Sequence, residues 1–299
     1  MTKDVRNAWL LLAMAILVWG INWPIMKIGL AHIGPLWFAA CRILLGAAVL
    51  FVFLGLTSRL TLPVRSEMPV LFSVGLVQVG ACMALLHASV LFIDPGKAAV
   101  LAYTTPIWAA PMAAIFLGEK MTLRKAAGIG LGIAGVVALF DLTALSTGWD
   151  DNASGNAMPL ISALLWAGVI VHIRGHGWVR PHLSLLPWQL LAGGLLLSVV
   201  AFIGEGAPSF VLNRELVAIL AYNGIAATAF SFWAYNGAAR VLPASTTALA
   251  SLSIPVVGVI SSTLMLGDPI TNAIILGLIL IAAGITLSSL SASSTIRRR

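Results

Sequence analysis

Few ionisable side chains lie inside the long apolar segments of this chain, and two of them could do chemistry. Arg42 lies about 10 Å along the apolar segment that follows Pro35, if that segment is a helix with a rise of about 1.5 Å per residue. A buried cation suits the carboxylate or phosphate of a substrate, and His87 in another segment could bind a substrate or a proton. The structural alternatives are an Arg42 that bonds backbone carbonyls or pairs with Asp94 or Asp141. His87 could equally be a satisfied core histidine.

Aromatic and hydrogen-bonding side chains recur inside the same apolar segments. Trp19, Asn22 and Trp23 share one face of a helix at their spacing, together with Met26. Because an indole N–H or a phenol O–H has no partner in lipid, such groups should face protein or a wet cavity. The other candidates for this role are Tyr103, Thr104, Trp108, Trp166, Trp233, Tyr235 and Ser253. Each could be an ordinary contact between helices, but as a set they indicate a cavity with flat apolar walls and a few hydrogen-bonding groups.

A glycine motif matches a dinucleotide-binding fingerprint in spacing only. The motif Gly130-x-Gly132-x-x-Gly135 lies in the middle of an apolar segment, whereas the fingerprint needs a preceding strand and a loop at a helix start. Gly128 and Gly132 instead form a GxxxG pair, which is typical of helices that pack closely in a membrane. The sequence contains no Walker loop, no H-E-x-x-H motif and no acid pair within an apolar segment. We therefore expect no cofactor and no enzyme activity.

Histidine and cysteine residues do not predict a metal site. His172 and His176 lie four residues apart and His182 follows them, so a weak site is one interpretation, but a solvated loop explains the same set. Cys41 and Cys82 lie singly inside apolar segments, which supports neither a disulfide framework nor a metal knuckle. We therefore expect no bound metal.

The composition predicts a membrane protein. Hydrophobic residues make up 60% of the 299 residues and charged residues only 9%, and the mean hydropathy is +1.02. Soluble domains carry about 25% charged residues, so a soluble globule is excluded. The net charge of +7 could suggest a nucleic-acid partner. The basic residues lie in short loops between apolar segments rather than on one surface, so we expect no nucleic-acid partner.

The apolar segments predict ten transmembrane helices. Each segment is close to the length of about 20 residues that a helix needs to cross a bilayer. None shows the strict alternation that barrel strands require. The expected spans are 7–30, 35–56, 68–92, 95–118, 122–141, 156–174, 183–204, 214–239, 243–266 and 271–292. The fold class is therefore an all-α integral membrane protein.

The basic residues predict the orientation of these spans. If the amino terminus lies inside, the segments on that side hold 13 of the 17 Lys and Arg residues, and the outer side holds only Lys97 and Arg214. Cytoplasmic loops carry the excess of Lys and Arg, so both termini should be cytoplasmic. We expect the protein in a bacterial inner (plasma) membrane.

The two halves of the chain resemble each other after a shift of 149 residues. This shift places Pro106 on Pro255 and Thr122 on Thr271 without a gap. The loop before Thr122 and the residues after it are basic in the first copy, whereas the second copy has no basic residue there. Since five is an odd number of spans, a second five-span copy must start on the opposite face of the membrane. Chance similarity among Ala, Gly and Leu is the alternative explanation.

The repeat predicts two domains and a pair of hinges. The first five-helix unit should cover residues 1–147 and the second, inverted unit residues 148–299. Pro106 and Pro255 lie at matching positions near the middle of their spans. A proline inside a helix removes a hydrogen bond and bends or breaks the helix. These two could be static kinks, or positions where the helices flex during alternating access.

Several segments resemble the EamA-type branch of the drug/metabolite transporter superfamily. They are L-V-W-G-I-N-W at residues 17–23 with Lys27, A-A-C-R-I-L-L at 39–45, and P-x₁₁-G-E-x-x-T at 106–122 with its echo at 255–271. The resemblance implies ten helices in two inverted halves around a central cavity. It further implies that the first, third, fourth, sixth, eighth and ninth helices surround this cavity. Within the family the chain is similar to YddG-like exporters of aromatic and other neutral amino acids.

Together these observations predict a secondary transporter. We expect export of small neutral or zwitterionic metabolites, above all amino acids including aromatic ones, by alternating access. A membrane enzyme, a lipid-handling protein that uses the cavity, or a channel are the alternatives. The small residues of the fifth and tenth helices, at 122–141 and 271–292, make these helices candidates for scaffold contacts or for a homodimer interface.

Overall fold

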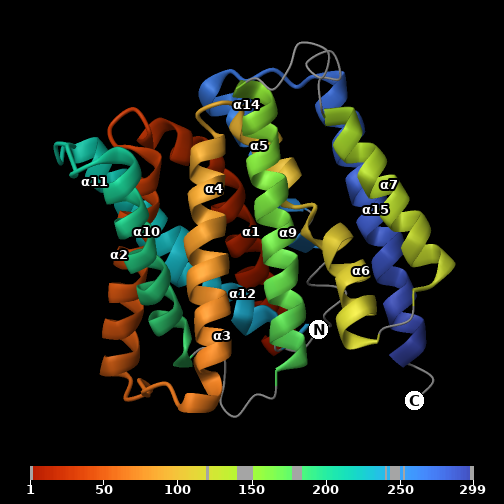
Figure 1. Cartoon of the computed structure of the whole chain (residues 1–299), viewed down its shortest axis with the longest axis horizontal. Coiled ribbons are helices and arrows are strands. Elements are labelled where there is room, and N and C mark those ends of the chain that lie inside the picture. Colours follow the sequence, from red (N-terminus) through yellow and green to blue (C-terminus); the bar gives the residue numbers. More distant parts are fainter. Residues whose placement is uncertain are drawn as a thin grey trace.

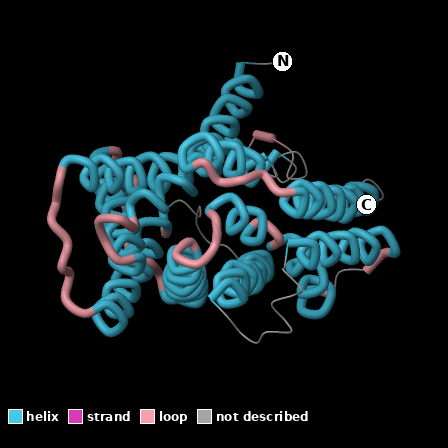
Figure 2. Tube along the Cα trace, turned by 90° about the horizontal axis from the view of Figure 1, so that it is seen from above, coloured by secondary structure: helices cyan, strands magenta, loops and turns pink. Residues whose placement is uncertain are grey.

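The fold is known from a computed structural model, which describes residues 3–118, 121–139, 151–176, 184–239, 241–242, 250–251 and 253–296. The described residues form helices and loops and contain no strand (Figure 2). Seven helical stretches in this part are long and apolar enough to cross a membrane. These stretches are Asp4–Gly29, Pro35–Leu56, Arg65–Ser89, Pro95–Leu117, Ala153–Ile173, Leu186–Glu205 and Arg214–Tyr235. The described part therefore has the all-α fold predicted from the apolar segments, with helices that could span a membrane.

Some of these stretches consist of more than one helical segment. In the first half the elements are α1 (Lys3–Gly29), α2 (Pro35–Leu56), η1 (Arg65–Glu67), α3 (Met68–Phe72), η2 (Ser73–Ala81), α4 (Cys82–Ser89), α5 (Pro95–Ala102), α6 (Thr105–Leu117) and α7 (Leu123–Leu139). In the second half they are α9 (Asp151–Gly175), α10 (Leu186–Glu205), α11 (Arg214–Ala221), η4 (Tyr222–Phe230), α12 (Ser231–Ala239), α14 (Ser253–Leu266) and α15 (Asn272–Ile296). The segments η2 and η4 are π-helices, so the third and eighth spans are wider in their middle than an α-helix.

The remaining predicted spans are shorter or partly outside the described residues. The prediction at 122–141 corresponds to α7, with 17 residues. The predictions at 243–266 and 271–292 correspond to α14 and α15, whose described apolar parts are Ser253–Leu266 and Asn272–Leu287. Residues 243–249 lie outside the described part. The count of ten membrane spans therefore stays a prediction.

Helices in the two halves begin and end at positions that differ by the same 149 residues seen in the sequence. This offset relates the starts of η1 and α11, of η2 and η4, and of α7 and α15. It also relates Gly118 and Gly267, which end α6 and α14 with the left-handed φ values of 65° and 76°. Glycine adopts this conformation without a steric penalty. The internal repeat of the sequence thus specifies a repeat of local structure.

The loops after these glycines also form the same cap. The Thr122 hydroxyl accepts a hydrogen bond from the Lys125 N–H at 3.2 Å, and the Thr271 hydroxyl accepts one from the Ile274 N–H at 3.2 Å. Each threonine satisfies one of the backbone donors that the first turn of a helix leaves free.

The boundary predicted between residues 147 and 148 lies outside the described residues, so the exact division of the chain stays a prediction.

Equivalent helices of the two halves pack antiparallel. At one end of the molecule α7 lies against α15 (Figure 1). A Cβ added to Gly135 would lie 2.9 Å from Gly277 O, and one added to Gly284 would lie 2.4 Å from Gly128 O. Lower numbers in α7 therefore face higher numbers in α15. The close packing predicted from the GxxxG pair is confirmed, and it joins two helices of the same chain.

The helices α2 and α10 make a second antiparallel pair at the opposite end of the molecule (Figure 1). Added Cβ atoms at Gly194 and Gly204 would lie 2.6 Å from Leu44 Cδ2 and 3.2 Å from Leu36 Cδ1. Two pairs of equivalent helices are thus antiparallel. An inverted repeat would produce such pairs, and the inverted relation of the two complete halves stays a prediction.

The loops that follow the third and ninth spans meet at one end of the bundle. Partial desolvation and the nearby carboxylate of Asp268 raise the pKa of Asp94, and the ammonium groups of Lys27 and Lys97 offset only part of this rise. The ammonium group of Lys27 donates to the carbonyl of Val90, and the hydroxyl of Ser262 donates to Asp268. Which side of the membrane this end faces stays a prediction.

The antiparallel pair α7 and α15 generates a stability prediction. Gly284→Ala should destabilise the protein by about 1–3 kcal/mol, because the new methyl group meets backbone atoms that cannot move aside. Gly130→Ala is the matched control, since a Cβ there meets nothing within 4 Å. This control should be neutral or stabilising by up to about 1 kcal/mol, because alanine favours a helix. Thermal unfolding of both variants in detergent checks the prediction, and equal transition temperatures would contradict the described contact.

Candidate functional site

The Arg42 side chain reaches from α2 to two neighbouring spans. Its Nη1 lies 3.4 Å from Nε2 of His87 on α4, and its Nη2 donates to the hydroxyl of Thr228 on η4 at 3.3 Å. All three side chains are buried, and Arg42 is only 6% exposed. We call these residues the Arg42 group. It connects the second, third and eighth spans.

The hydrogen bonds of His87 define its role in the Arg42 group. Its Nδ1 lies 2.7 Å from the carbonyl of Met83, and a carbonyl can only accept, so Nδ1 carries the proton. Nε2 then has a free lone pair and accepts from Arg42. The imidazole ring also lies against Phe38, with 5.5 Å between the ring centroids. In this arrangement His87 is neutral and orients the guanidinium.

Arg42 has no carboxylate partner in the described part of the chain. An ion pair within 4.0 Å in this part joins His32 and Glu215 near the surface, away from Arg42. The predicted alternative of a pair with Asp94 is therefore not found, and Asp141 lies outside the described residues. The Nε atom of Arg42 is buried and has no hydrogen-bond partner.

A cluster of aromatic rings lies next to the Arg42 group. The indole N–H of Trp19 donates to the carbonyl of Ala227 at 2.8 Å, and Ala227 precedes Thr228 in η4. The Trp19 ring contacts Phe232 and Tyr235, with centroid distances of 5.7 and 5.3 Å. Tyr103 packs with Trp19 and Tyr235 against the same buried core. We call Trp19, Tyr103, Phe232 and Tyr235 the aromatic cluster.

The fourth span is interrupted beside this cluster. Tyr103 and Thr104 separate α5 from α6, and Pro106 is the second residue of α6. The proline ring clashes with the carbonyl four residues earlier, so the helix ends at Ala102. The sequence predicted a bend or a break at this proline, and the structure has the break, between two helices. The Thr104 hydroxyl donates to Leu101 O at 2.7 Å and accepts from Trp108 Nε1 at 3.1 Å.

Pro255 lies at the matching position of the ninth span. It is in α14, whose described residues begin at Ser253, after residue 252, which lies outside the described part. Ser253 is exposed and Pro255 is buried. A small cavity of about 10 Å³ lies between Tyr103, Pro255 and α15. This volume suits one water molecule at most, so binding a metabolite there requires the helices to move apart.

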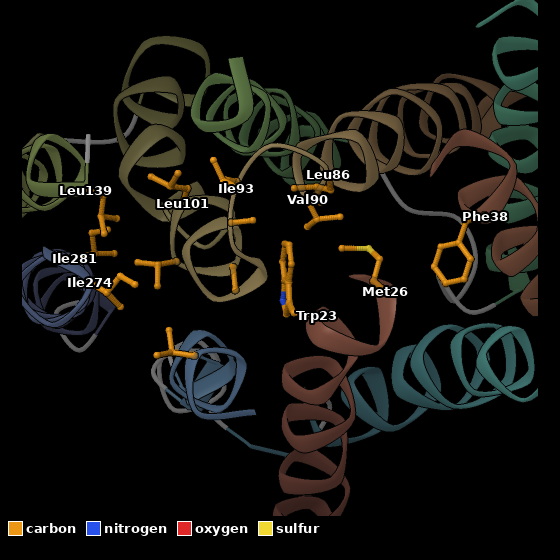
Figure 3. Packing of buried hydrophobic residues seen from close by; sticks show 14 of the residues in the cluster. Trp23, Met26, Phe38, Leu86, Val90, Ile93, Leu101, Leu139, Ile274 and Ile281 are labelled. Carbon is orange, nitrogen blue, oxygen red and sulfur yellow. The ribbon is translucent and has the colours of Figure 1, made fainter. Parts of the chain in front are cut away.

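The other predicted site residues lie in different surroundings. Asn22 and Trp23 are buried, and Oδ1 of Asn22 has no hydrogen-bond partner. Trp23 fills the core beside Met26 and Val90 (Figure 3), as an ordinary contact between helices would. Trp166 on α9 is half-buried. Trp233 is 38% exposed, and its ring contacts Phe230 rather than the aromatic cluster.

The π-helix η4 contributes residues that the sequence reasoning missed. Thr228 holds Arg42, and the phenol of Tyr222 donates to Val18 O at 2.8 Å. A phenol inside an apolar segment was a usable signal for Tyr222, as it was for Tyr103. Thr228 carried no such signal, because a threonine in a helix can bond its own backbone.

The predicted histidine set does not form a metal site in the described residues. His172 Nδ1 lies 2.8 Å from the hydroxyl of Ser73, and the rings of His172 and His176 are 6.2 Å apart. His182 lies outside the described part of the chain. Within that part, no group of three metal-ligating side chains forms.

Comparisons with known proteins agree with this architecture. The family described as "EamA-like transporter family" matches residues 7–140 and again residues 153–290. The chain is 30% identical over 280 residues to "Uncharacterized transporter YoaV" of Bacillus subtilis (strain 168), with 93% of this chain and 94% of that protein covered. It is 27% identical over 296 residues to a "Probable amino-acid metabolite efflux pump" of Salmonella typhimurium (strain LT2), with 95% of each covered.

A solved crystal structure has the same fold. It matches with a TM-score of 0.65 and 20% sequence identity, and 95% of this chain and 96% of that chain are covered. At this identity the match concerns the fold alone. The family match spans both halves of the chain and the relatives match nearly its whole length, so this integral membrane protein belongs to the EamA-like transporter family.

Proposed function

We propose that this protein is a secondary transporter that exports small neutral or zwitterionic metabolites by alternating access. Its substrates are above all amino acids, including aromatic ones. It resides in a bacterial inner membrane with both termini in the cytoplasm, as the distribution of basic residues predicts.

The antiparallel packing of equivalent helices carries this proposal. Two halves that are related by a half turn about an axis in the membrane plane can adopt two arrangements of nearly equal energy. One of these opens to each side of the membrane. The pairs α7 with α15 and α2 with α10 lie at opposite ends of the molecule (Figure 1). They can act as fixed supports while the spans between them move.

The irregular segments provide the places where these central spans can move. The fourth span is interrupted at Tyr103 and Thr104, and Pro255 lies at the equivalent position of the ninth span. Backbone without regular helix in a membrane is tolerated where protein or water satisfies it. We therefore assign the two prolines to hinges of the inward and outward gates.

The aromatic cluster suits a substrate that carries a flat apolar group, such as an aromatic side chain. Trp19 and Tyr103 present ring faces and edges where the first, fourth, eighth and ninth spans meet. In the open states the remaining predicted residues would contribute polar atoms and walls: Asn22, Trp23, Thr104, Trp108, Trp166, Trp233 and Ser253. The curated relatives named amino-acid metabolite efflux pumps, in Salmonella typhimurium and in Escherichia coli (strain K12), agree with an amino-acid substrate.

The homodimer expected from the fifth and tenth helices stays a prediction. The glycine-containing faces of α7 and α15 already pack against each other. A dimer through these helices would have to use their outward faces, which carry the exposed side chains of Ile133, Val137, Ile275 and Ile279.

The first functional prediction concerns transport itself. Liposomes that contain the purified chain should take up labelled amino acids faster than empty liposomes, and the uptake should saturate. Unlabelled amino acid trapped inside should accelerate the uptake of labelled amino acid, because a carrier exchanges substrate and a pore does not. Equal uptake by loaded and empty liposomes across neutral and aromatic amino acids would contradict the proposed function.

The second functional prediction concerns Trp19. Trp19→Ala should weaken uptake of aromatic amino acids by about tenfold, because the substrate loses a ring contact and burial. Trp9→Ala is the matched control on the same helix, since Trp9 is 40% exposed and far from the cluster along α1. Uptake should be measured on variants that remain folded. An unchanged rate for Trp19→Ala would remove this residue from the site.

The third functional prediction concerns the hinge in the fourth span. Pro106→Ala should let α5 and α6 join more readily, so the exchange rate should fall severalfold while substrate binding changes little. Pro111→Ala in the same helix is the matched control, because Ile260 occupies its equivalent position in the second half. Counterflow measures the rate, and competition measures the binding. Equal rates for both variants would contradict the hinge at Pro106.

A further inference from the structure

The Arg42 group holds a cation that the described protein leaves without an anion. Arg42 is 6% exposed, and the hydrogen bonds to His87 and Thr228, at 3.4 and 3.3 Å, are long. Both partners are neutral, and Nε has no partner. A guanidinium has five N–H donors, so most of its hydrogen-bonding capacity is free.

An uncompensated charge at this position is costly. Removing a charged group from water costs several kcal/mol even in relaxed proteins, and a paired anion normally offsets this cost. In membrane spans, buried ionisable residues face cavities or pair with each other, and they mark substrate or ion pathways. An arginine retained without a counter-ion is thus expected to obtain one during function.

The Arg42 group and Trp19 are connected through neighbouring residues of η4. The hydroxyl of Thr228 accepts a hydrogen bond from Nη2 of Arg42. The carbonyl of the preceding residue, Ala227, accepts one from the indole N–H of Trp19. The Arg42 group and the aromatic cluster are therefore attached to adjacent residues of η4. A ligand with a ring against Trp19 and an anionic group a short distance away would reach both.

The chemistry of the group favours a carboxylate over a phosphate. Arg42 offers a single positive charge, and its described neighbours His87 and Thr228 are neutral. Lys27 donates to Val90 O instead. A carboxylate carries one charge, and its two oxygens fit the edge formed by Nε–H and a neighbouring Nη–H. A phosphate carries more charge than this group can balance.

We propose that Arg42 is the counter-ion for the carboxylate of the exported amino acid. The carboxylate accepts from Nε–H and from the Nη2–H on the same edge, while His87 keeps Nη1 in place and Thr228 accepts from the second hydrogen of Nη2. The substrate ring lies against Trp19. The proposal rests on the proposed function and specifies its substrate class as compounds that carry a free carboxylate beside an aromatic side group.

A comparison of phenylalanine with phenylalaninamide tests this role. Both compounds have the same ring, but only phenylalanine has a carboxylate. Competition against labelled phenylalanine in proteoliposomes should show that wild type prefers phenylalanine to the amide by about tenfold or more, as hydrogen bonds to charged groups predict. Arg42→Gln should lose this preference, and Arg42→Lys should retain part of it. Arg59→Gln, at an exposed arginine between spans, is the matched control and should behave as wild type.

Thermal unfolding without ligand separates a binding role from a structural one. Arg42→Met replaces the buried charge by an apolar side chain of similar length, so this variant should unfold at the same or a higher temperature than wild type. If Arg42 supports the fold, Arg42→Met and Arg42→Gln should unfold at lower temperatures or fail to fold. That result would overturn the proposal.

The outcomes distinguish this proposal from the function on which it rests. Wild type that transports phenylalanine and phenylalaninamide equally well, or Arg42→Gln that keeps the preference, would overturn the role of Arg42 and leave the transport function intact. Wild type that recognises neither compound nor any other amino acid would overturn both.

Discussion

Lipid offers no hydrogen-bond partners, and this constraint explains where the protein departs from regular helix. At two such departures inside spans, a nearby side chain bonds the backbone. At the interruption of the fourth span, Thr104 bonds Leu101 O and Trp108. In the π-helix η4, the hydroxyl of Thr228 bonds Asn223 O at 2.8 Å. Both of these departures lie in spans that meet at the aromatic cluster.

The same constraint makes the pairing of equivalent helices important. Lipid provides no hydrophobic drive for helix association, so contacts depend on close approach of backbones. The glycines of α7 and α15 allow that approach, and because these helices are equivalent, their contact fixes the relation between the halves. The antiparallel pairs at the two ends of the molecule, with irregular segments between them, suit the alternating access proposed above.

Much of this architecture could be predicted from the sequence. The span expected at 35–56 is α2 with the same bounds, and the 149-residue offset recurs in the starts of helices. The third span was expected from residue 68 but starts at Arg65. Its polar first turn looked like a loop, and the Glu67 carboxylate accepts from Val64 N to cap it. The π-helices were missed, because hydrophobicity in a fully apolar segment does not reveal the number of residues per turn.

The site was harder to predict than the fold. Arg42, His87, Trp19 and Tyr103 stood out because polar or amphipathic groups in apolar segments need partners. Their grouping into two sets depends on which faces of neighbouring helices meet, and that information is not contained in a single sequence. Thr228 is the clearest example, since only its hydrogen bond from Arg42, between η4 and α2, gives it a role.

The central claim is that the halves are inverted in the membrane, and cysteine labelling tests it directly. In a chain with Cys41 and Cys82 replaced by alanine, single cysteines would be introduced as Met121→Cys and Pro269→Cys, in the two equivalent loops. A membrane-impermeant maleimide added to intact bacterial cells should label the cysteine at position 269. The one at position 121 should react only after the membrane is permeabilised. Labelling of both positions from the same side would contradict the inverted arrangement and the transport mechanism built on it.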